Sequence, residues 1–136
     1  MIAHAQELIP HRPPMCFVDA LMECTETTAV ATTCLAGGHF AVADGAVLEA
    51  ALVECVAQTV AATMGQRARA TGKSGTPVRG MLTSVSGFKI LSRPAAGKLL
   101  RIEIRELKRL GMMLMISGVI TCEDQTIATG EMTLYA

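Results

Sequence analysis

The sequence predicts an α+β fold in which one long apolar helix packs against an antiparallel sheet of about five to six strands. Three observations lead to this prediction. A single stretch, residues 46–64, is rich in helix-forming residues and too long for a strand. The chain after Pro77 consists of strand-like segments separated by turn signals. With 136 residues and no linker or internal repeat, residues 1–136 are expected to form a single domain.

The first third of the chain is expected to contain a short helix followed by two strands. Residues 2–9 fit a short helix that ends at Pro10, which lacks the N–H that a helix needs. Residues 15–22 are apolar and sheet-like, and residues 25–35 are rich in Thr, Val and Ala, which favours a strand. Gly37-Gly38 marks the end of this second strand.

The long helix is expected to begin after a turn at Asp44-Gly45, where Asp44 is also a candidate N-cap. It covers residues 46 to about 64, and Gly65 marks a kink or an early end. Residues 66–76 are expected to form the helix end and an exposed loop. Because the helix is apolar on nearly every side, a curved sheet must wrap around it. One copy leaves part of the helix and a sheet edge uncovered, which favours dimerisation.

Four strands are expected after Pro77. The clearest is residues 99–107, where Leu100, Ile102 and Ile104 alternate with charged residues, as in a strand with one face in water. Pro94 and Gly97 mark the connection that precedes it. The four strands are predicted over residues 78–91, 99–107, 112–122 and 126–135, with turns at 110–111 and 123–125.

Charge and cysteine content restrict the function. Twelve basic and twelve acidic residues cancel, and no basic stripe with interleaved aromatic residues points to nucleic acid. Eleven of the basic residues lie between Arg67 and Arg109, so this half of the chain could meet a small acidic partner. The five cysteines are odd in number and lack Cys-x-x-Cys spacing, so we expect reduced, mostly buried thiols in a cytoplasmic protein without a metal site. No signal peptide is visible, and Glu49, Glu54 and Gln58 argue against a membrane-crossing helix.

Glu54 is the first candidate for chemistry. It lies among Leu, Val, Ala and Cys residues, where a carboxyl group has to be paired, hydrogen-bonded or protonated. The alternative is that Glu54 belongs to an outer stripe of the helix with Glu49 and with Gln58, which shares its face four residues on.

His39 is the second candidate. It follows Gly37-Gly38, and a loop histidine at a glycine hinge suits acid/base catalysis. The alternative is a histidine at the surface or at the helix N-terminus. His11, between Pro10 and Arg12, is expected to be a turn residue whose ring packs or bonds to the backbone.

Four segments, in order, resemble the 3-hydroxyacyl-(acyl carrier protein) dehydratases of type II fatty acid synthesis. They are residues 8–19 (LIPHRPPMCFVD), 38–40 (GHF), 54–58 (ECVAQ) and 88–94 (FKILSRP). The resemblance implies a hotdog fold, in which a sheet wraps round one helix, and a site where His39 of one subunit meets Glu54 of the other. The connection between them departs from the family, because Leu48 and Glu49 replace the usual Pro-Gly and the prolines are missing. In this the chain is similar to the dehydratases of aryl polyene pigment clusters.

The resemblance implies dehydration of a 3-hydroxyacyl thioester to the trans-2-enoyl thioester, in fatty acid or polyene-type biosynthesis. Neutral His39 would take the C2 proton, and a protonated Glu54 would supply the proton for the leaving hydroxyl. Gln58 would orient Glu54 or a water, and Gln58 and Gly45 are the expected substrate-binding residues. Backbone N–H groups at the helix start would polarise the thioester carbonyl. No metal or redox cofactor is expected, and the substrate would be carried on the phosphopantetheine of a carrier protein or of coenzyme A.

The expected partners are acyl carrier protein or acyl-CoA, and a second hotdog chain in a homodimer, a higher oligomer or a heteromer. No nucleic acid or membrane partner is expected. Arg67, Lys89, Arg93 and Arg109 are the basic residues that could meet the carrier. Two rival functions stay open. A hotdog thioesterase would use a helix carboxylate to activate water, and a non-catalytic hotdog chain would be the structural half of a heteromer.

Overall fold

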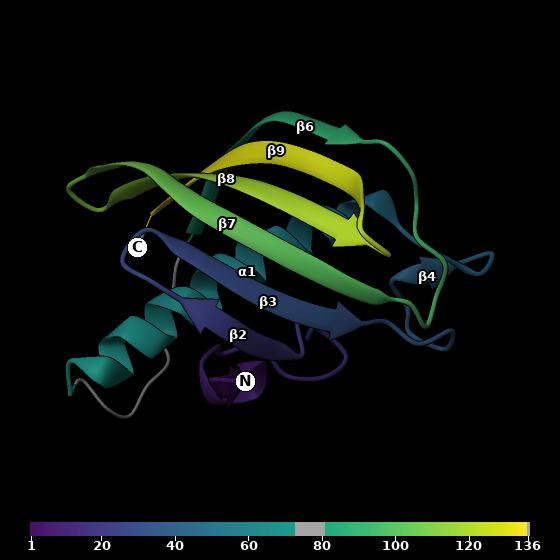
Figure 1. Ribbon diagram of the computed structural model, residues 1–136, viewed down its shortest axis with the longest axis horizontal. Helices are drawn as coiled ribbons and strands as arrows, with labels where there is room; N and C mark the ends of the chain where they lie inside the picture. The colour runs from purple at the N-terminus through teal and green to yellow at the C-terminus, as the bar shows by residue number, and fades with distance from the viewer. Residues whose placement is uncertain (73–80, 136) are drawn as a thin grey trace.

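The computed structural model describes residues 1–72 and 81–135 and consists of one long helix on one face of a curved sheet (Figure 1). The N-terminal half contains β1 (Ala3–His4), a 3-10 turn η1 (Ala5–Glu7), β2 (Ala20–Cys24), β3 (Thr28–Cys34), β4 (Val42–Ala43), β5 (Ala46–Val47) and α1 (Glu49–Ala70). The C-terminal half contains β6 (Met81–Ile90), β7 (Leu99–Leu110), β8 (Met113–Cys122) and β9 (Gln125–Tyr135).

The main sheet has seven antiparallel strands in the order β1-β2-β3-β7-β8-β9-β6. The predicted count of five to six is too low because the two-residue β1 adds an edge strand. The strand after α1, β6, pairs with β9 instead of β7, so it forms the edge opposite to β1. β7 pairs with β3, which joins the two halves of the chain in one sheet.

The alternation predicted for residues 99–107 is confirmed. Leu100, Ile102 and Ile104 of β7 are at most 5% exposed, and Arg101 and Arg105 are exposed. Each buried aliphatic side chain of this size stabilises the fold by about 1.5–3 kcal/mol. The buried side chains form the core between α1 and the inner face of the sheet.

The predicted start of the long helix is wrong by three residues. The Asp44-Gly45 turn exists, and both residues have positive φ angles, 54° and 76°, but it joins β4 to β5 instead of leading into α1. The Arg93 guanidinium holds this hairpin by donating to the carbonyl oxygens of Ala43, Ala46 and Val47 at 2.9–3.1 Å. Asp44 is therefore not the N-cap. Leu48 occupies that position without a capping side chain.

Gly65 does not end or kink the helix, which continues to Ala70. It is there because the N-terminal segment passes close to α1: a Cβ at Gly65 would collide with the Leu8 carbonyl oxygen. The short helix predicted for residues 2–9 is also wrong. That segment forms β1 and η1, and Ala5, Leu8 and Ile9 are buried.

We expect Gly65→Ala to destabilise the protein by about 1–3 kcal/mol, because the added methyl overpacks the contact with Leu8. Helix propensity alone predicts the opposite sign, a gain of about 1 kcal/mol. Urea unfolding followed by circular dichroism measures the difference. Ala68→Gly on the same helix is the control for propensity, and a stabilised Gly65→Ala protein would show that the close approach is not tight.

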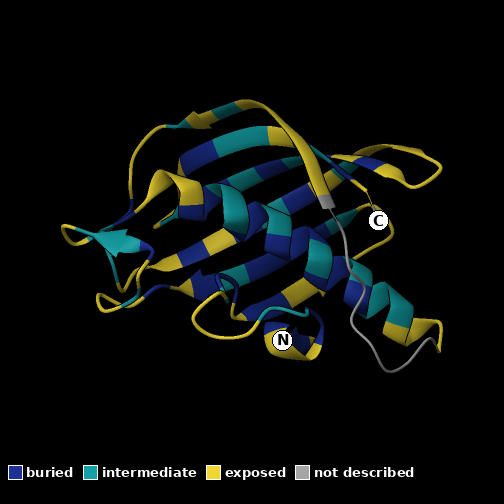
Figure 2. Cartoon of the chain, turned by 180° about the vertical axis from the view of Figure 1, so that it is seen from behind, coloured by how far each residue is buried: buried dark blue, intermediate teal, exposed yellow. Residues whose placement is uncertain are grey.

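The side of α1 that the sheet does not cover is partly exposed along its length (Figure 2). Glu54, Ala57, Ala61 and Met64 recur along it at helical spacing and are all of intermediate exposure. We call these four residues the open stripe.

No described helix is both long enough and apolar enough to span a lipid bilayer.

The expectation of mostly buried thiols is only partly met. All five cysteines are free, but only Cys55 is buried, Cys34 is exposed, and the others are intermediate. Of the predicted loop at 66–76, residues 66–70 belong to α1 and 71–72 form a turn, and the remainder lies outside the described residues. Residues 78–80 of the first strand predicted after Pro77 also lie outside them.

Candidate functional site

Gln58 is the centre of a hydrogen-bond network on the N-terminal half of α1. Its side chain is 1% exposed and makes three hydrogen bonds. Its Oε1 accepts from the Phe17 backbone N–H at 2.8 Å, and its Nε2 donates to the Met15 carbonyl at 2.7 Å and to Glu54 Oε1 at 3.0 Å. Because only the amide oxygen can accept from Phe17, the NH₂ group has to face Met15 and Glu54. Gln58 therefore presents a fixed donor to the carboxyl group one helical turn away.

Glu54 is less buried than its sequence neighbours suggest. Its side chain is 34% exposed because it lies on the open stripe and not against the sheet. The structure thus places Glu54 and Gln58 together, as the spacing of four predicts, but the described residues of one chain do not form the apolar enclosure expected around Glu54. Only a further chain or ligand covering the open stripe would remove this carboxyl group from water.

A cavity of about 380 Å³ lies beside Glu54. The three apolar members of the open stripe follow one another along its wall, and Pro10, Val60, Leu82 and Leu134 complete its apolar lining. The polar groups sit at one end, where Glu54, Gln58 and His11 converge. An apolar slot with a few polar groups at its mouth is suited to a ligand with a polar head and an aliphatic tail.

His11 is the residue that the sequence interpretation missed. Its Nε2 lies 3.8 Å from Glu54 Oε1, and its side chain is 32% exposed. It is not merely a turn residue, because its ring faces the same cavity as Glu54. Their separation of 43 positions leaves no spacing signal in the sequence. The only sequence signal was the resemblance of the segment around His11 to a dehydratase motif.

His39 lies in the loop before β4, and Phe17 links it to the Gln58 network. The rings of His39 and Phe17 meet edge to face at 5.2 Å, and His39 stacks on Phe40 at 5.0 Å. The backbone of Phe17 is held by Gln58 and by the Cys55 thiol, which donates to the Phe17 carbonyl at 3.3 Å. Burial raises the pKa of the Cys55 thiol to about 12, so it stays a neutral donor.

The tautomer of His39 is fixed by its own loop. The Ala41 backbone N–H donates to His39 Nδ1 at 3.0 Å, so Nδ1 carries no proton. The neutral ring then holds its proton on Nε2. The polar contacts of the described residues include none between His39 and Glu54 of the same chain.

Gly45 and the start of α1 follow the His39 loop in the chain. Gly45 is in the β4–β5 turn, and its carbonyl accepts from the Ala96 N–H at 2.9 Å. It is thus four residues before α1 and not at the helix N-terminus. No described side chain caps α1, and the Ala51 N–H donates to the Leu48 carbonyl at 3.1 Å, so the Glu49 and Ala50 N–H groups are the ones without a partner among the described residues.

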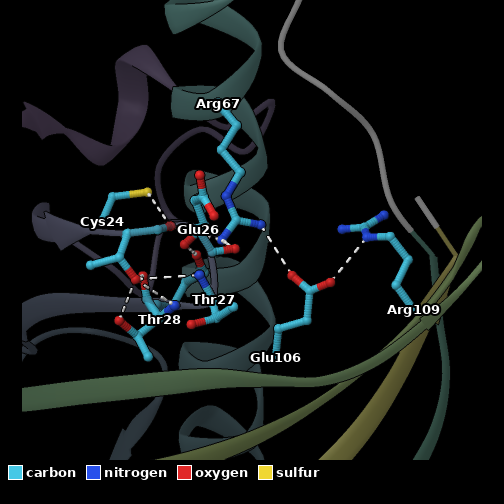
Figure 3. Close-up of polar contacts among 10 residues, drawn as sticks. Cys24, Glu26, Thr27, Thr28, Arg67, Glu106 and Arg109 are labelled. Carbon is cyan, nitrogen blue, oxygen red and sulfur yellow. Dashed lines mark hydrogen bonds and ion pairs between the residues drawn. The ribbon is translucent and has the colours of Figure 1, made fainter.

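A second polar cluster ties the far end of α1 to the sheet (Figure 3). Arg67 donates to the Thr25 and Glu26 carbonyls at 2.9 and 2.7 Å and to Glu106 at 3.3 Å, and Arg109 donates to Glu106 at 3.1 Å. Its hydrogen bonds give Arg67 a structural role. Arg93 is likewise occupied by the β4–β5 hairpin. Of the four basic residues considered for carrier binding, Lys89, Arg93 and Arg109 are exposed, but the Arg93 guanidinium is taken up by the hairpin carbonyl groups.

The described residues contain no group of three or more His, Cys, Asp or Glu side chains placed to hold a metal ion. Glu54, His11 and His39 are side chains that can donate or accept a proton.

Residues 3–136 match the model of a protein family described as ApeP-like, ApeP dehydratase. A comparison with curated protein sequences gave no match. Among solved structures, the dehydratase heterocomplex ApeI:P from Xenorhabdus doucetiae has a TM-score of 0.88 at 17% identity, over 98% of this chain and 90% of that one.

Two thioesterase structures are also similar. A hypothetical thioesterase with coenzyme A from Streptococcus pneumoniae gives a TM-score of 0.68 at 12% identity, covering 85% of this chain and 86% of that one. A putative thioesterase from Ralstonia eutropha gives 0.66 at 15%, covering 86% and 83%. These likenesses confirm the predicted hotdog fold.

Proposed function

Because this chain belongs to the ApeP-like dehydratase family, we propose that it takes part in dehydrating a 3-hydroxyacyl thioester to the trans-2-enoyl thioester. The observation that supports this best is the Glu54–Gln58 pair at the mouth of an apolar cavity. The acyl chain would lie along the open stripe, with the thioester and its 3-hydroxyl group beside Glu54. The substrate would be carried on phosphopantetheine, as part of a carrier protein or of coenzyme A.

The reaction needs one group to take the C2 proton and another to protonate the leaving hydroxyl, which departs as water. We assign these roles to His39 of one chain and Glu54 of another. Gln58 holds one carboxyl oxygen, so the other oxygen is available to the substrate. The uncapped N–H groups at the start of α1 would polarise the thioester carbonyl. Gly45 would contribute only by shaping the loop that leads to the start of α1.

Assembly with a second hotdog chain is part of the proposal. The open stripe and the β6 edge leave apolar side chains such as Leu82 and Val85 in water, at 39% and 43% exposure. Covering them would also shield Glu54. The similar structure from Xenorhabdus doucetiae is described as a heterocomplex, which makes a heteromer as reasonable as a homodimer.

One observation favours a second candidate. In it, this chain contributes Glu54 to a site whose histidine belongs to a different hotdog protein, and not to a second copy of this chain. To act as the base, His39 needs Nε2 free of its proton. The Ala41 N–H bonded to Nδ1 favours the opposite tautomer. Either this contact is exchanged in the assembled site, or the histidine of the site comes from a different subunit while this chain contributes Glu54.

The test compares wild type with His39→Ala and Glu54→Gln, using 3-hydroxyacyl and saturated acyl thioesters. We expect each substitution to lower dehydration by about a hundredfold or more. Near wild-type turnover in either variant would remove that residue from the mechanism. Free thiol released from the saturated thioester would instead favour a thioesterase. Activity that requires a second hotdog protein, and survives His39→Ala, would support the completing role.

A further inference from the structure

His11 and Glu54 are the two titratable side chains among the described residues that line the 380 Å³ cavity. The imidazole Nε2 and the carboxyl Oε1 are 3.8 Å apart, which is an ion-pair distance and longer than a hydrogen bond. Both side chains are about one-third exposed. The other groups on the cavity wall are apolar, apart from Gln58, so no other charge there competes for Glu54.

The segment that carries His11 is well anchored. Ile9, two residues before, is fully buried, and Arg12 Nη1 donates to the carbonyl oxygens of Ile9 and His11 at 2.9 and 2.7 Å. Further on, the Met15 carbonyl accepts from Gln58 Nε2. The histidine is thus fixed relative to the same amide that holds Glu54.

One nitrogen of the His11 ring is buried without a hydrogen-bond partner. His11 Nδ1 is buried and has no hydrogen-bond partner among the described residues. A proton on Nδ1 would be a buried, unbonded N–H, which costs free energy. The tautomer with its proton on Nε2 is therefore favoured, and Nε2 is the ring atom that lies 3.8 Å from Glu54 Oε1.

We propose that His11 is a positioning residue for Glu54: together with Gln58 it directs two N–H donors at Oε1 and leaves Oε2 to exchange protons with the substrate. This rests on the proposed function of Glu54. A carboxyl group fixed through one oxygen keeps the other in a constant orientation, which proton transfer requires. His11 itself does not touch the reacting atoms.

The kinetic test compares His11→Leu with His11→Gln. Leucine removes the donor, and glutamine places an amide N–H near the position of Nε2. We expect His11→Leu to lower kcat about tenfold with KM changed less than twofold, and His11→Gln to recover most of the loss. The exposed His4→Leu is the matched control. Thermal unfolding and oligomeric state are measured for each variant, so that a misfolded protein is recognised.

A spectroscopic test does not depend on turnover. Long-range ¹⁵N–¹H spectra of the histidine rings should show the Nε2–H tautomer for His11, and its Nε2 signal should shift in Glu54→Gln but not in Glu49→Gln. If wild type lacks dehydratase activity while these spectra behave as expected, the proposed function fails and the pairing stands. An unchanged Nε2 signal in Glu54→Gln, or His11→Leu kinetics within twofold of wild type, would overturn the proposal.

Discussion

An equimolar mixture of the His39→Ala and Glu54→Gln proteins is expected to regain about a quarter of wild-type dehydratase turnover, although each variant alone is nearly inactive. The reason is the assembly. If a site takes His39 from one chain and Glu54 from the other, a mixed dimer contains one intact site and one site that lacks both groups. Random exchange makes about half of the dimers mixed, and half of their sites are intact.

The measurement requires subunit exchange, for example by mild denaturation and refolding of the mixture, followed by a dehydration assay with a 3-hydroxyacyl thioester. A mixture of His39→Ala with the double variant His39→Ala/Glu54→Gln is the control, because none of its dimers has an intact site. A mixture that stays inactive while wild type is active would place both residues in the same chain's site. If wild type needs a different hotdog partner, the test moves to that pair, and only one of the two substitutions in this chain should then matter.

Replacing Gln58 with leucine is expected to destabilise the fold by about 3–5 kcal/mol, the largest loss of stability that the site predicts. Leucine is similar in size, so the loss does not come from a cavity. It comes from the buried Phe17 N–H and the part-buried Met15 carbonyl, which both lose their partner. A buried polar group left without a partner costs about 1–3 kcal/mol. Glu54 also loses its donor, so activity should fall with stability.

Equilibrium unfolding in urea measures this change, with the midpoint and slope compared between variants. Gln66→Leu is the matched control, because Gln66 lies two turns further along α1 and makes no side-chain hydrogen bond among the described residues. We expect its effect to stay within about 0.5 kcal/mol. A loss below 1 kcal/mol for Gln58→Leu would mean that water replaces the amide, and that Gln58 does not fix the segment at 15–17.

Local patterns predicted much of the fold. The alternation in 99–107 identifies β7 because a strand with one buried face repeats every two residues. The Asp44-Gly45 turn could be predicted because few other residues adopt positive φ easily. The spacing of Glu54 and Gln58 predicted their contact because residues four apart share a helix face. These patterns express backbone and side-chain preferences within one element.

Local patterns gave wrong predictions where contacts with a distant segment of the chain determine the local structure. A glycine in a helix usually weakens it, so the sequence predicts a kink or an early end at Gly65. In the structure it admits the Leu8 backbone, 57 residues earlier in the chain. The sequence predicts a helix start at residue 46, three residues early, because it does not show that β4 and β5 pair or that Arg93 binds their carbonyl groups.

The sequence by itself determined the α+β fold, the single long helix and the pairing of Glu54 with Gln58, because these depend on residue types at short, regular spacings; its motifs also resemble those of a dehydratase family. Only the tertiary structure decided that His11 faces Glu54, that Arg67 and Arg93 are occupied internally and that Glu54 lies on a stripe open to water. Each of these depends on which segments, tens of residues apart, pack side by side. A side chain's partners and exposure are properties of that packing, and no local pattern encodes them.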